Sequence, residues 1–229
     1  MSEEKKRREK ERAAEAASAL IEDGMVVGLG TGSTAELAIR NIGKRIKEER
    51  LVVIGVPTSL RTEALAIECG VPFTTLSEHP DLDICIDGAD QVDAHINLLK
   101  GGWGSHTREK IVSYAAQRRV ICVEEEKVGE LLTKPVPLEV LPYAVKVVEK
   151  QVKELGGTPV LRLDGSRGGY FATEHGNLVI DADFGVIRNP EEMNVALSSV
   201  VGSVEHGIFT NATEVYVGTE KGVKILRRD

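Results

Sequence analysis

One stretch near the start of the chain decides its fold: Met25-Val-Val-Gly-Leu29, then Gly30-Thr-Gly-Ser-Thr34, then Ala35-Glu-Leu-Ala-Ile39. The first run predicts a buried strand, and the last predicts the start of a helix. Glycines let the backbone approach an anion, Ser33 and Thr34 add hydroxyl donors, and the free N–H groups of the helix start point to the same place. The stretch therefore predicts a site for a phosphorylated ligand.

This loop matches neither of the common nucleotide-binding motifs. A dinucleotide fingerprint that begins at Gly28 and Gly30 needs its third glycine where Ser33 stands, and the Gly-Lys-Ser/Thr ending of a nucleotide P-loop is absent. A small phosphate ester fits the loop better. Taken alone, the loop is equally compatible with a turn that caps a helix through Ser33 or Thr34. Other residues have to decide between the two interpretations.

A second predicted strand ends in a group of carboxylates. The apolar run Leu82–Ile86 reads as a buried strand, and Asp87, Asp90 and Asp93 follow it directly. In an open α/β sheet ligands bind at the carboxyl ends of the strands, so aspartates at this position are candidates for ligand binding. By itself, the pair Asp87-Gly88 is also an ordinary turn sequence.

A second glycine-rich loop starts at Lys100 and leads into a helix predicted to begin near Thr107. Glu109 belongs to the first turn of this helix. Considered singly, Lys100 is as compatible with a solvated side chain, and Thr107 with Glu109 is as compatible with a simple helix start. Both loops and the aspartates lie at strand-to-helix junctions of one sheet, however, so chance is a poor explanation for the whole set.

Taken together, these motifs resemble those of the type A ribose-5-phosphate isomerases. The matching segments are Gly28–Thr34, Asp87–Asp90, Lys100–Gly102 and Thr107–Lys110, and the similarity continues through Pro135–Pro142, Gly176–Asp181, Glu205–Phe209 and Val217–Val223. The resemblance implies an intramolecular oxidoreductase that interconverts ribose 5-phosphate and ribulose 5-phosphate in the pentose phosphate pathway. The alternatives are another sugar-phosphate enzyme on the same fold, such as a deaminase or a lactonase, and a non-catalytic sugar-phosphate sensor.

The resemblance also implies a role for each matching residue. Glu109 is the expected base that moves a proton between neighbouring carbons through an enediolate, and Lys100 compensates the charge of the developing oxyanion. Asp87 and Asp90 are expected to bind sugar hydroxyls and to help shuttle protons. The expected substrate-binding residues are Thr31, Gly32, Ser33 and Thr34 at the phosphate, Gly88, Ala89, Gly101, Gly102 and Trp103 along the sugar, and Lys127.

Two of the matching motifs depart from the usual pattern of this family, the second at Gln91 and the third over Trp103–His106, and the role of Lys10 is a further question. Gln91 stands where a glutamate is usual, and Trp103 and His106 stand where a glycine and a leucine are usual. The indole of Trp103 either lines the sugar pocket or packs beneath the neighbouring lobe or another subunit. Lys10 matches an N-terminal lysine that reaches the phosphate in the family, but the sequence alone favours a charged helix face.

Composition excludes several classes of protein. The chain has 229 residues and a net charge of −7, with no basic block outside its N-terminus, which argues against a nucleic-acid partner. Cys69, Cys85 and Cys122 lie mostly in apolar runs and are unpaired in spacing, which predicts buried thiols in a reducing compartment. No Cys/His motif marks a metal site, and we expect no cofactor. No apolar run approaches the ~20 residues of a membrane span, so we expect a cytoplasmic protein that binds no membrane. We also expect it to form a homodimer or homotetramer.

The order of predicted elements gives the architecture. Alternating strands and helices up to about Val123 predict an α/β fold whose open, mostly parallel, Rossmann-like sheet is flanked by helices. From about Lys134 a Pro-rich segment is followed by a helix over residues 144–155, strands near residues 160, 171 and 179, a helix after Pro190 and a strand before His206, which predict a smaller α+β lobe. We expect a catalytic domain of residues 1–130 and 207–229 and an α+β domain of residues 131–206. The family resemblance implies that the last two strands return to the catalytic domain.

Overall fold

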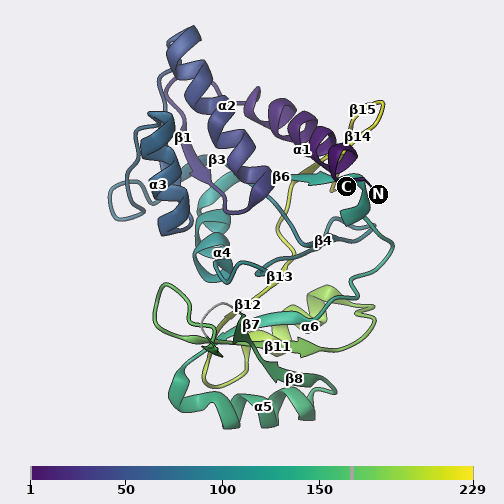
Figure 1. Ribbon diagram of the computed structural model, residues 1–229. Helices are drawn as coiled ribbons and strands as arrows, with labels where there is room; N and C mark the ends of the chain where they lie inside the picture. The colour runs from purple at the N-terminus through teal and green to yellow at the C-terminus, as the bar shows by residue number, and fades with distance from the viewer. Residues whose placement is uncertain (1, 166–167, 229) are drawn as a thin grey trace. The chain divides into compact units, whose positions relative to one another are not determined.

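The computed structural model describes residues 2–165 and 168–228. The chain divides into two compact units (Figure 1). Unit 1 comprises Met1–Ala89, Arg108–Val128 and Asn211–Asp229, and unit 2 comprises Asp90–Thr107 and Gly129–Thr210. Because the three segments of unit 1 alternate with the two segments of unit 2, the chain passes from one unit to the other four times.

Unit 1 is built on a six-stranded sheet with the strand order β15-β14-β6-β3-β1-β2. Its strands are β1 (Val26–Leu29), β2 (Ile54–Pro57), β3 (Leu82–Asp87), β6 (Ala116–Glu124), β14 (Glu214–Thr219) and β15 (Gly222–Arg227). Every neighbouring pair is parallel except β14 with β15, which are antiparallel. These pairings confirm the predicted mostly parallel sheet, and they confirm that the last two strands return to it.

Helices cover both faces of this sheet. They are α1 (Glu3–Ser18), α2 (Ser33–Glu49), α3 (Leu60–Cys69) and α4 (His106–Ala115), of which α4 begins in the last two residues of unit 2. One core packs α1, α2 and α3 against strand residues such as Leu29 and Ile84. The other core packs Val112 of α4 against Val56 and Cys85. Ile84 and Cys85 serve opposite faces because successive side chains of a strand alternate.

Unit 2 contains a four-stranded antiparallel sheet in the order β12-β7-β11-β8. Its strands are β7 (Val136–Val140), β8 (Thr158–Leu161), β11 (Leu178–Asp183) and β12 (Ser203–His206), and the helices α5 (Val145–Glu154) and α6 (Pro190–Ser198) pack on it. Two smaller antiparallel sheets join β13 (Ile208–Phe209), β5 (Leu98–Leu99) and β4 (Gln91–Val92), and β10 (Gly169–Tyr170) with β9 (Leu163–Asp164). Short 3-10 helices lie at η1 (Glu125–Lys127) in unit 1 and η2 (Pro142–Ala144) in unit 2.

The segment after Lys134 differs from the sequence-based expectation. We expected a Pro-rich segment there and assigned no strand to it, whereas the structure has the strand β7 between β12 and β11. Pro137 is tolerated because it lies where the β12 pairing ends: the last register pair is His206 with Leu138, and the Gly207 N–H donates to the Pro137 carbonyl at 2.8 Å. A proline lacks an N–H, so it fits best where a ladder stops.

One segment, residues 90–107, falls in a different unit from the domain that we expected for it. Residues 90–107, which we expected in the catalytic domain, group with unit 2. The reason is strand pairing: β4 pairs with β5, and β5 pairs with β13 just before the chain returns to unit 1. The domain boundaries themselves remain a prediction.

The structure bears on the cysteines, on membrane spans and on metal binding. Cys69, Cys85 and Cys122 are all free and buried, as predicted. Within residues 2–165 and 168–228, no helix combines the length and apolar character that crossing a bilayer requires. In the same residues, no group of three or more His, Cys, Asp or Glu side chains is placed to hold a metal ion.

Candidate functional site

The glycine loop of unit 1 lies at the carboxyl end of β1, between that strand and α2. Gly32 is the N-cap residue of α2 and has a φ of 114°, which glycine adopts without strain. The first N–H groups of a helix have no partner within the helix, so the start of α2 can receive an anion. The strand order reverses between β2 and β3, which flank β1, and this reversal is where open α/β sheets bind ligands.

Asp87 ties this loop to the end of β3. Its Oδ1 accepts hydrogen bonds from the N–H of Thr31 at 3.1 Å and from the N–H of Gly88 at 2.7 Å. Gly30 allows this approach, since a Cβ at position 30 would lie 2.2 Å from Asp87 Oδ1. Asp87 is 1% exposed. The structure thus brings the glycine loop and Asp87, the first residue of the second predicted motif, together within unit 1.

A cluster of buried hydroxyl groups supports the loop from behind. Thr31 Oγ1 lies 2.8 Å from Thr58 Oγ1, 2.8 Å from Ser59 Oγ and 3.0 Å from Thr62 Oγ1. Thr62 Oγ1 also donates to the Gly30 carbonyl at 3.0 Å. The side chain of Thr31 therefore faces this cluster, while Ser33 is exposed at the first position of α2. Sequence reasoning placed Thr31 at the phosphate and did not find the other three hydroxyls.

Lys10 reaches the glycine loop from α1. Its Nζ lies 3.0 Å from Ser33 Oγ and 3.7 Å from Glu124 Oε1. The sequence alone favoured a charged helix face, and the structure instead directs this lysine to the predicted phosphate loop. A signal was present: Lys10 shares a helix face with Ala13, Ala14 and Ala17, which are buried.

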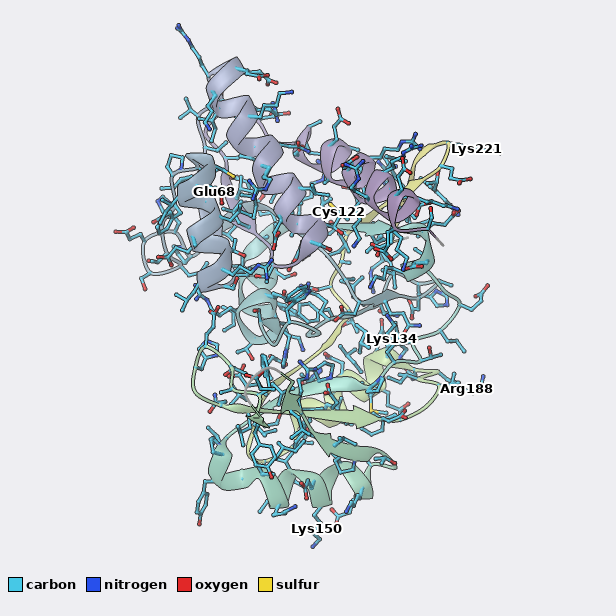
Figure 2. The ribbon with its side chains drawn as sticks, in the orientation of Figure 1. Glu68, Cys122, Lys134, Lys150, Arg188 and Lys221 are labelled. Carbon is cyan, nitrogen blue, oxygen red and sulfur yellow. The ribbon has the colours of Figure 1, made fainter. Side chains whose placement is uncertain are left out.

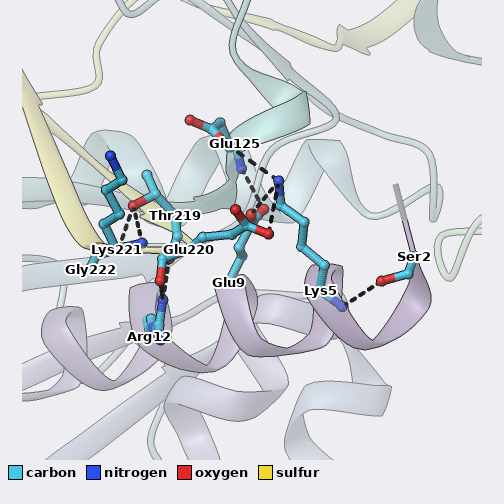
Figure 3. Close-up of polar contacts among 9 residues, drawn as sticks. All are labelled: Ser2, Lys5, Glu9, Arg12, Glu125, Thr219, Glu220, Lys221 and Gly222. Atoms are coloured by element: carbon cyan, nitrogen blue, oxygen red, sulfur yellow. Dashed lines mark hydrogen bonds and ion pairs between the residues drawn. The ribbon is translucent and has the colours of Figure 1, made fainter.

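Glu9, the neighbour of Lys10, ties α1 to the start of η1 (Figure 3). Its side chain is buried, and its Oε2 accepts the N–H of Glu125 at 3.2 Å. Lys5 Nζ lies 3.7 Å from the other carboxylate oxygen of Glu9 and 3.6 Å from Glu220. Lys127, the second lysine predicted to bind the substrate, is the last residue of η1. The hydrogen bond between Glu9 and Glu125 therefore joins the short helix that carries Lys127 to the helix that carries Lys10.

The turn between β14 and β15 is held by the same helix. Arg12 donates hydrogen bonds to the carbonyl oxygens of Thr219 and Glu220, as Figure 3 shows. Close to this turn, a Cβ at Gly218 would lie 1.8 Å from the Glu9 carbonyl, so α1 and β14 are in tight backbone contact. The charged N-terminal segment is therefore a fixed part of unit 1.

Glu109 occupies the first turn of α4, as the sequence predicted, and is 3% exposed. The preceding residue, Arg108, donates to the carbonyl of Pro57 at 3.1 Å, which fixes this turn against the end of β2. Lys100, Asp90 and the second glycine loop belong to unit 2.

In unit 2, Asp90 organises the second glycine loop. Its Oδ2 accepts the N–H of Gly102 at 2.8 Å, and its carbonyl accepts a hydrogen bond from Lys134 Nζ at 2.8 Å. Lys100 is 3% exposed; its N–H donates to the Gly207 carbonyl at 2.8 Å, and its ammonium group lies 5.7 Å from the centre of the Phe209 ring. The motif Lys100–Gly102 is therefore held at Lys100 by the residues at the start of β13 and at Gly102 by Asp90.

Of the unusual residues, Gln91 is explained by its hydrogen bonds. The Gln91 amide donates to the Leu131 carbonyl at 3.2 Å and to Thr133 Oγ1 at 3.1 Å, while its oxygen accepts the Thr133 N–H at 2.8 Å. A carboxylate at this position would lack the two donors, so glutamine suits the contact with residues 131–133. Trp103 is 55% exposed, and its predicted roles, in the sugar pocket or in packing beneath the neighbouring lobe or another subunit, stay predictions.

His106, the third departure, is a packed residue. Its side chain is buried, and its Nε2 lies 3.3 Å from the Glu205 carbonyl. A Cβ at Gly101 would lie 2.8 Å from His106 Nδ1, so the imidazole fills the space beneath the glycine loop.

A buried carboxylate that sequence analysis missed holds the start of α4. Glu139 of β7 is fully buried and accepts side-chain hydrogen bonds from Thr107, Thr173, His175 and Asn177, the last three at 2.9, 2.9 and 2.8 Å. Burial acts to raise the pKa of Glu139, but the four hydrogen bonds outweigh it and hold the pKa below its ordinary value. The donors come from distant parts of the sequence, so no local pattern could have revealed them.

Comparisons with known proteins agree with the motifs. The family model described as ribose 5-phosphate isomerase A (phosphoriboisomerase A) matches residues 54–222. A ribose-5-phosphate isomerase A from Methanosarcina acetivorans is 50% identical over 221 residues, covering 96% of this chain and 94% of that protein. One from Nostoc sp. is 42% identical over 224 residues, covering 96% of this chain and 95% of that protein.

Solved structures show the same similarity. Ribose 5-phosphate isomerase A from Methanocaldococcus jannaschii has a TM-score of 0.92 at 45% identity, covering 95% of this chain and 97% of that one. A D-ribose-5-phosphate isomerase in complex with phospho-erythronic acid has a TM-score of 0.93 at 39% identity, covering 96% of this chain and 97% of that one.

Proposed function

Because the chain belongs to the ribose 5-phosphate isomerase A family, as its motifs predicted, we propose that it interconverts ribose 5-phosphate and ribulose 5-phosphate in the pentose phosphate pathway. The observation that carries this proposal beyond family membership is the glycine loop. It lies at the switch point of the sheet, Asp87 is bonded to it, and Lys10 reaches it from α1. A phosphate monoester of a small sugar is the ligand that this combination suits.

In the proposed complex the start of α2 receives the phosphate group. Gly32, Ser33 and Thr34 supply N–H and hydroxyl donors, and Thr31 shapes the loop through its hydroxyl cluster. Lys10 adds a positive charge, since its Nζ is already 3.0 Å from Ser33 Oγ. Lys127 at the end of η1 is proposed as the second lysine of the binding site.

For the chemical step we propose Glu109 as the base. Isomerisation moves a proton between C2 and C1 through an enediolate, so one group has to accept the proton and others have to stabilise the oxyanion. In this proposal Lys100 stabilises the oxyanion, and Asp87 and Asp90 bind sugar hydroxyls and shuttle protons. The remaining proposed sugar contacts are Gly88, Ala89, Gly101, Gly102 and Trp103.

We expect this chemistry to need no metal ion or organic cofactor. A carboxylate base, one ammonium group and backbone donors together supply the proton acceptor and the oxyanion stabilisation that an enediolate requires. Activity is therefore expected to survive dialysis against a chelator, and a loss that a divalent ion restores would contradict the expectation.

We also propose that the protein is cytoplasmic and forms a homodimer or homotetramer. Three buried, free cysteines support a reducing compartment. Val147 and Val201 are exposed apolar residues whose main chains are bridged by Gln151, and Tyr143 nearby in sequence is fully exposed. Apolar groups gathered in this way support a subunit contact. Sedimentation equilibrium tests the proposal, and a monomer at all accessible concentrations would contradict it.

The function is tested with a panel of phosphopentoses and phosphohexoses assayed for isomerisation, ammonia release and lactone hydrolysis. We expect isomerisation of ribose 5-phosphate, and we expect Glu109→Gln to lower turnover by roughly 10² to 10⁴ because the amide cannot accept the proton. Glu48→Gln, a surface change on α2 that removes one ion pair with Lys44, is the matched control. Ammonia release or lactonase activity without isomerisation would favour the alternative enzymes, and near-normal turnover of Glu109→Gln would exclude this residue as the base.

A further inference from the structure

Arg162, which lies between β8 and β9 and outside every motif described above, donates hydrogen bonds to the second glycine loop of unit 2. Its side chain is 16% exposed, and its guanidinium group forms a two-pronged ion pair with Asp181 of β11. In one prong, Nε donates to Asp181 Oδ2 at 2.8 Å. A planar guanidinium matches a carboxylate in this way, and the pairing fixes its orientation.

The remaining nitrogen of Arg162 is directed at the glycine loop. It donates to the carbonyl of Gly101 at 2.9 Å and to the carbonyl of Gly102 at 3.3 Å. The guanidinium carbon lies 5.6 Å from the centre of the Phe171 ring. The same ring sets the next part of the loop, since a Cβ at Gly104 would lie 2.4 Å from Phe171 Cε1.

The opposite side of these peptide groups is held by Asp90. The carboxylate of Asp90 accepts the Gly102 N–H at 2.8 Å. Asp90 therefore binds the backbone N–H of Gly102, and Arg162 binds its backbone carbonyl. The loop needs such external contacts. Three of its five residues, Gly101, Gly102 and Gly104, have no side chain, and a glycine chain loses more conformational freedom on ordering than any other.

We propose that Arg162 is a positioning residue for the sugar-binding loop, residues 100–104, with Asp181 orienting it. The proposal rests on the proposed function, in which the same loop contacts the sugar. Arg162 touches no substrate in this scheme; it sets the direction of the Gly101 and Gly102 peptide groups before the sugar arrives. Lysine cannot replace it, because one ammonium group cannot hold the paired contact with Asp181 while also reaching two carbonyl groups.

The test compares Arg162→Met, Arg162→Lys and the control Arg188→Met. Arg188 is an exposed arginine of the same unit, labelled in Figure 2, and has no proposed role in the site. Two readouts are used: the steady-state constants for ribose 5-phosphate, and the fluorescence of Trp103. Trp103 is the single tryptophan of the chain and lies within the loop, so its emission and its quenching by acrylamide report the loop alone.

We expect Arg162→Met to raise KM about tenfold with a smaller change in kcat, because a disordered loop weakens sugar binding in the ground state and the transition state alike. Emission of Trp103 shifts to the red and quenching increases. Arg162→Lys shows the same pattern more weakly, and Arg188→Met matches the wild type. Addition of phospho-erythronic acid restores part of the wild-type emission in both Arg162 variants.

A merely structural role for Arg162 gives a different result. Loss of folded molecules lowers apparent kcat in proportion and leaves KM unchanged, and that outcome would overturn the proposal, as would wild-type KM and fluorescence in a folded Arg162→Met. If Arg162→Met does not fold, Arg162→Lys and Asp181→Asn decide by the same readouts. If the wild type shows no isomerase activity, the proposed function fails, while the fluorescence of Trp103 still tests whether Arg162 orders the loop.

Discussion

The two units hold their candidate site residues by different physical means. In unit 1 the residues lie at the ends of paired parallel strands, so the hydrogen-bond ladder of the sheet places them: Asp87 ends β3, and the loop of residues 30–34 follows β1. In unit 2 the corresponding strands β4, β5 and β13 are two residues long each. There the side chains of Asp90, Arg162 and Glu139 take over the positioning.

This difference indicates where each unit is sensitive to substitution. A site placed by a sheet depends on backbone packing, so a single added methyl group is expected to disturb it. A site placed by side chains depends on the pairing of buried polar groups, each of which costs free energy when it loses its partner. The comparison therefore predicts steric sensitivity in unit 1 and electrostatic sensitivity in unit 2.

The largest effect is expected for Gly30→Ala in unit 1. The added Cβ would lie 2.2 Å from Asp87 Oδ1 and 2.6 Å from Asp87 Cα, so either the loop or the end of β3 has to move. We expect kcat/KM to fall about 10²-fold, since a displacement of about 1 Å in a site costs that much, together with a loss of about 2 kcal/mol in unfolding free energy. Steady-state kinetics and urea unfolding measure the two effects.

Gly169→Ala is the matched control for this substitution. A Cβ at Gly169 meets no described atom within 4 Å, so this change is expected to leave both quantities near the wild-type values. If Gly30→Ala behaved like Gly169→Ala, the prediction that the site residues of unit 1 are sensitive to added volume would be wrong.

The next effect is expected for Glu139→Gln in unit 2. The amide keeps the shape of the side chain but offers a single acceptor oxygen, so some of the four donors around it lose their partner. We expect a loss of about 3 kcal/mol in unfolding free energy at pH 7. Glu154→Gln, an exposed position of α5 paired with Lys150, is the control and is expected to lose less than about 1 kcal/mol.

The pH dependence of this loss gives a second test. Because the pKa of Glu139 is lowered in the folded state, its stabilising contribution is present above the ordinary glutamate pKa of about 4.3 and disappears as the pH falls through the folded value. The difference between wild type and Glu139→Gln is therefore expected to shrink as the pH falls from 5 to 3. A difference that stays constant over this range would show that Glu139 acts through its shape and not its charge.

Sequence reasoning succeeded where the backbone places the residues. The glycine loop and Asp87 could be assigned to strand ends of one sheet because alternating strands and helices produce a parallel sheet, and such a sheet gathers its carboxyl ends at one edge. The position of Glu109 in the first turn of α4 followed from the helix pattern in the same way.

It failed where side chains from distant segments meet. Arg162 and Gly101 are 61 residues apart, and Thr107 and Glu139 are 32 residues apart, so neither pair leaves a periodic signal. The same limit hid the strand β7, where a proline between apolar residues reads as irregular until the end of its neighbour β12 is known. Lys10 is the intermediate case, because its shared face with three buried alanines was visible and was outweighed by its charged neighbours.

The smallest effect is expected for Thr62→Val, which tests whether unit 1 also relies on side chains. Valine has nearly the same shape but removes the hydroxyl that donates to the Gly30 carbonyl at 3.0 Å and contacts Ser59 Oγ at 2.9 Å. We expect a loss of about 1 kcal/mol in unfolding free energy and a rise in KM of about threefold, with Thr62→Ser close to the wild type because it keeps the hydroxyl. If the strand ends place the loop, kcat stays nearly unchanged. A loss of kcat/KM as large as that of Gly30→Ala would mean that the hydroxyl cluster places the phosphate loop, and the two units would then hold their sites by the same means.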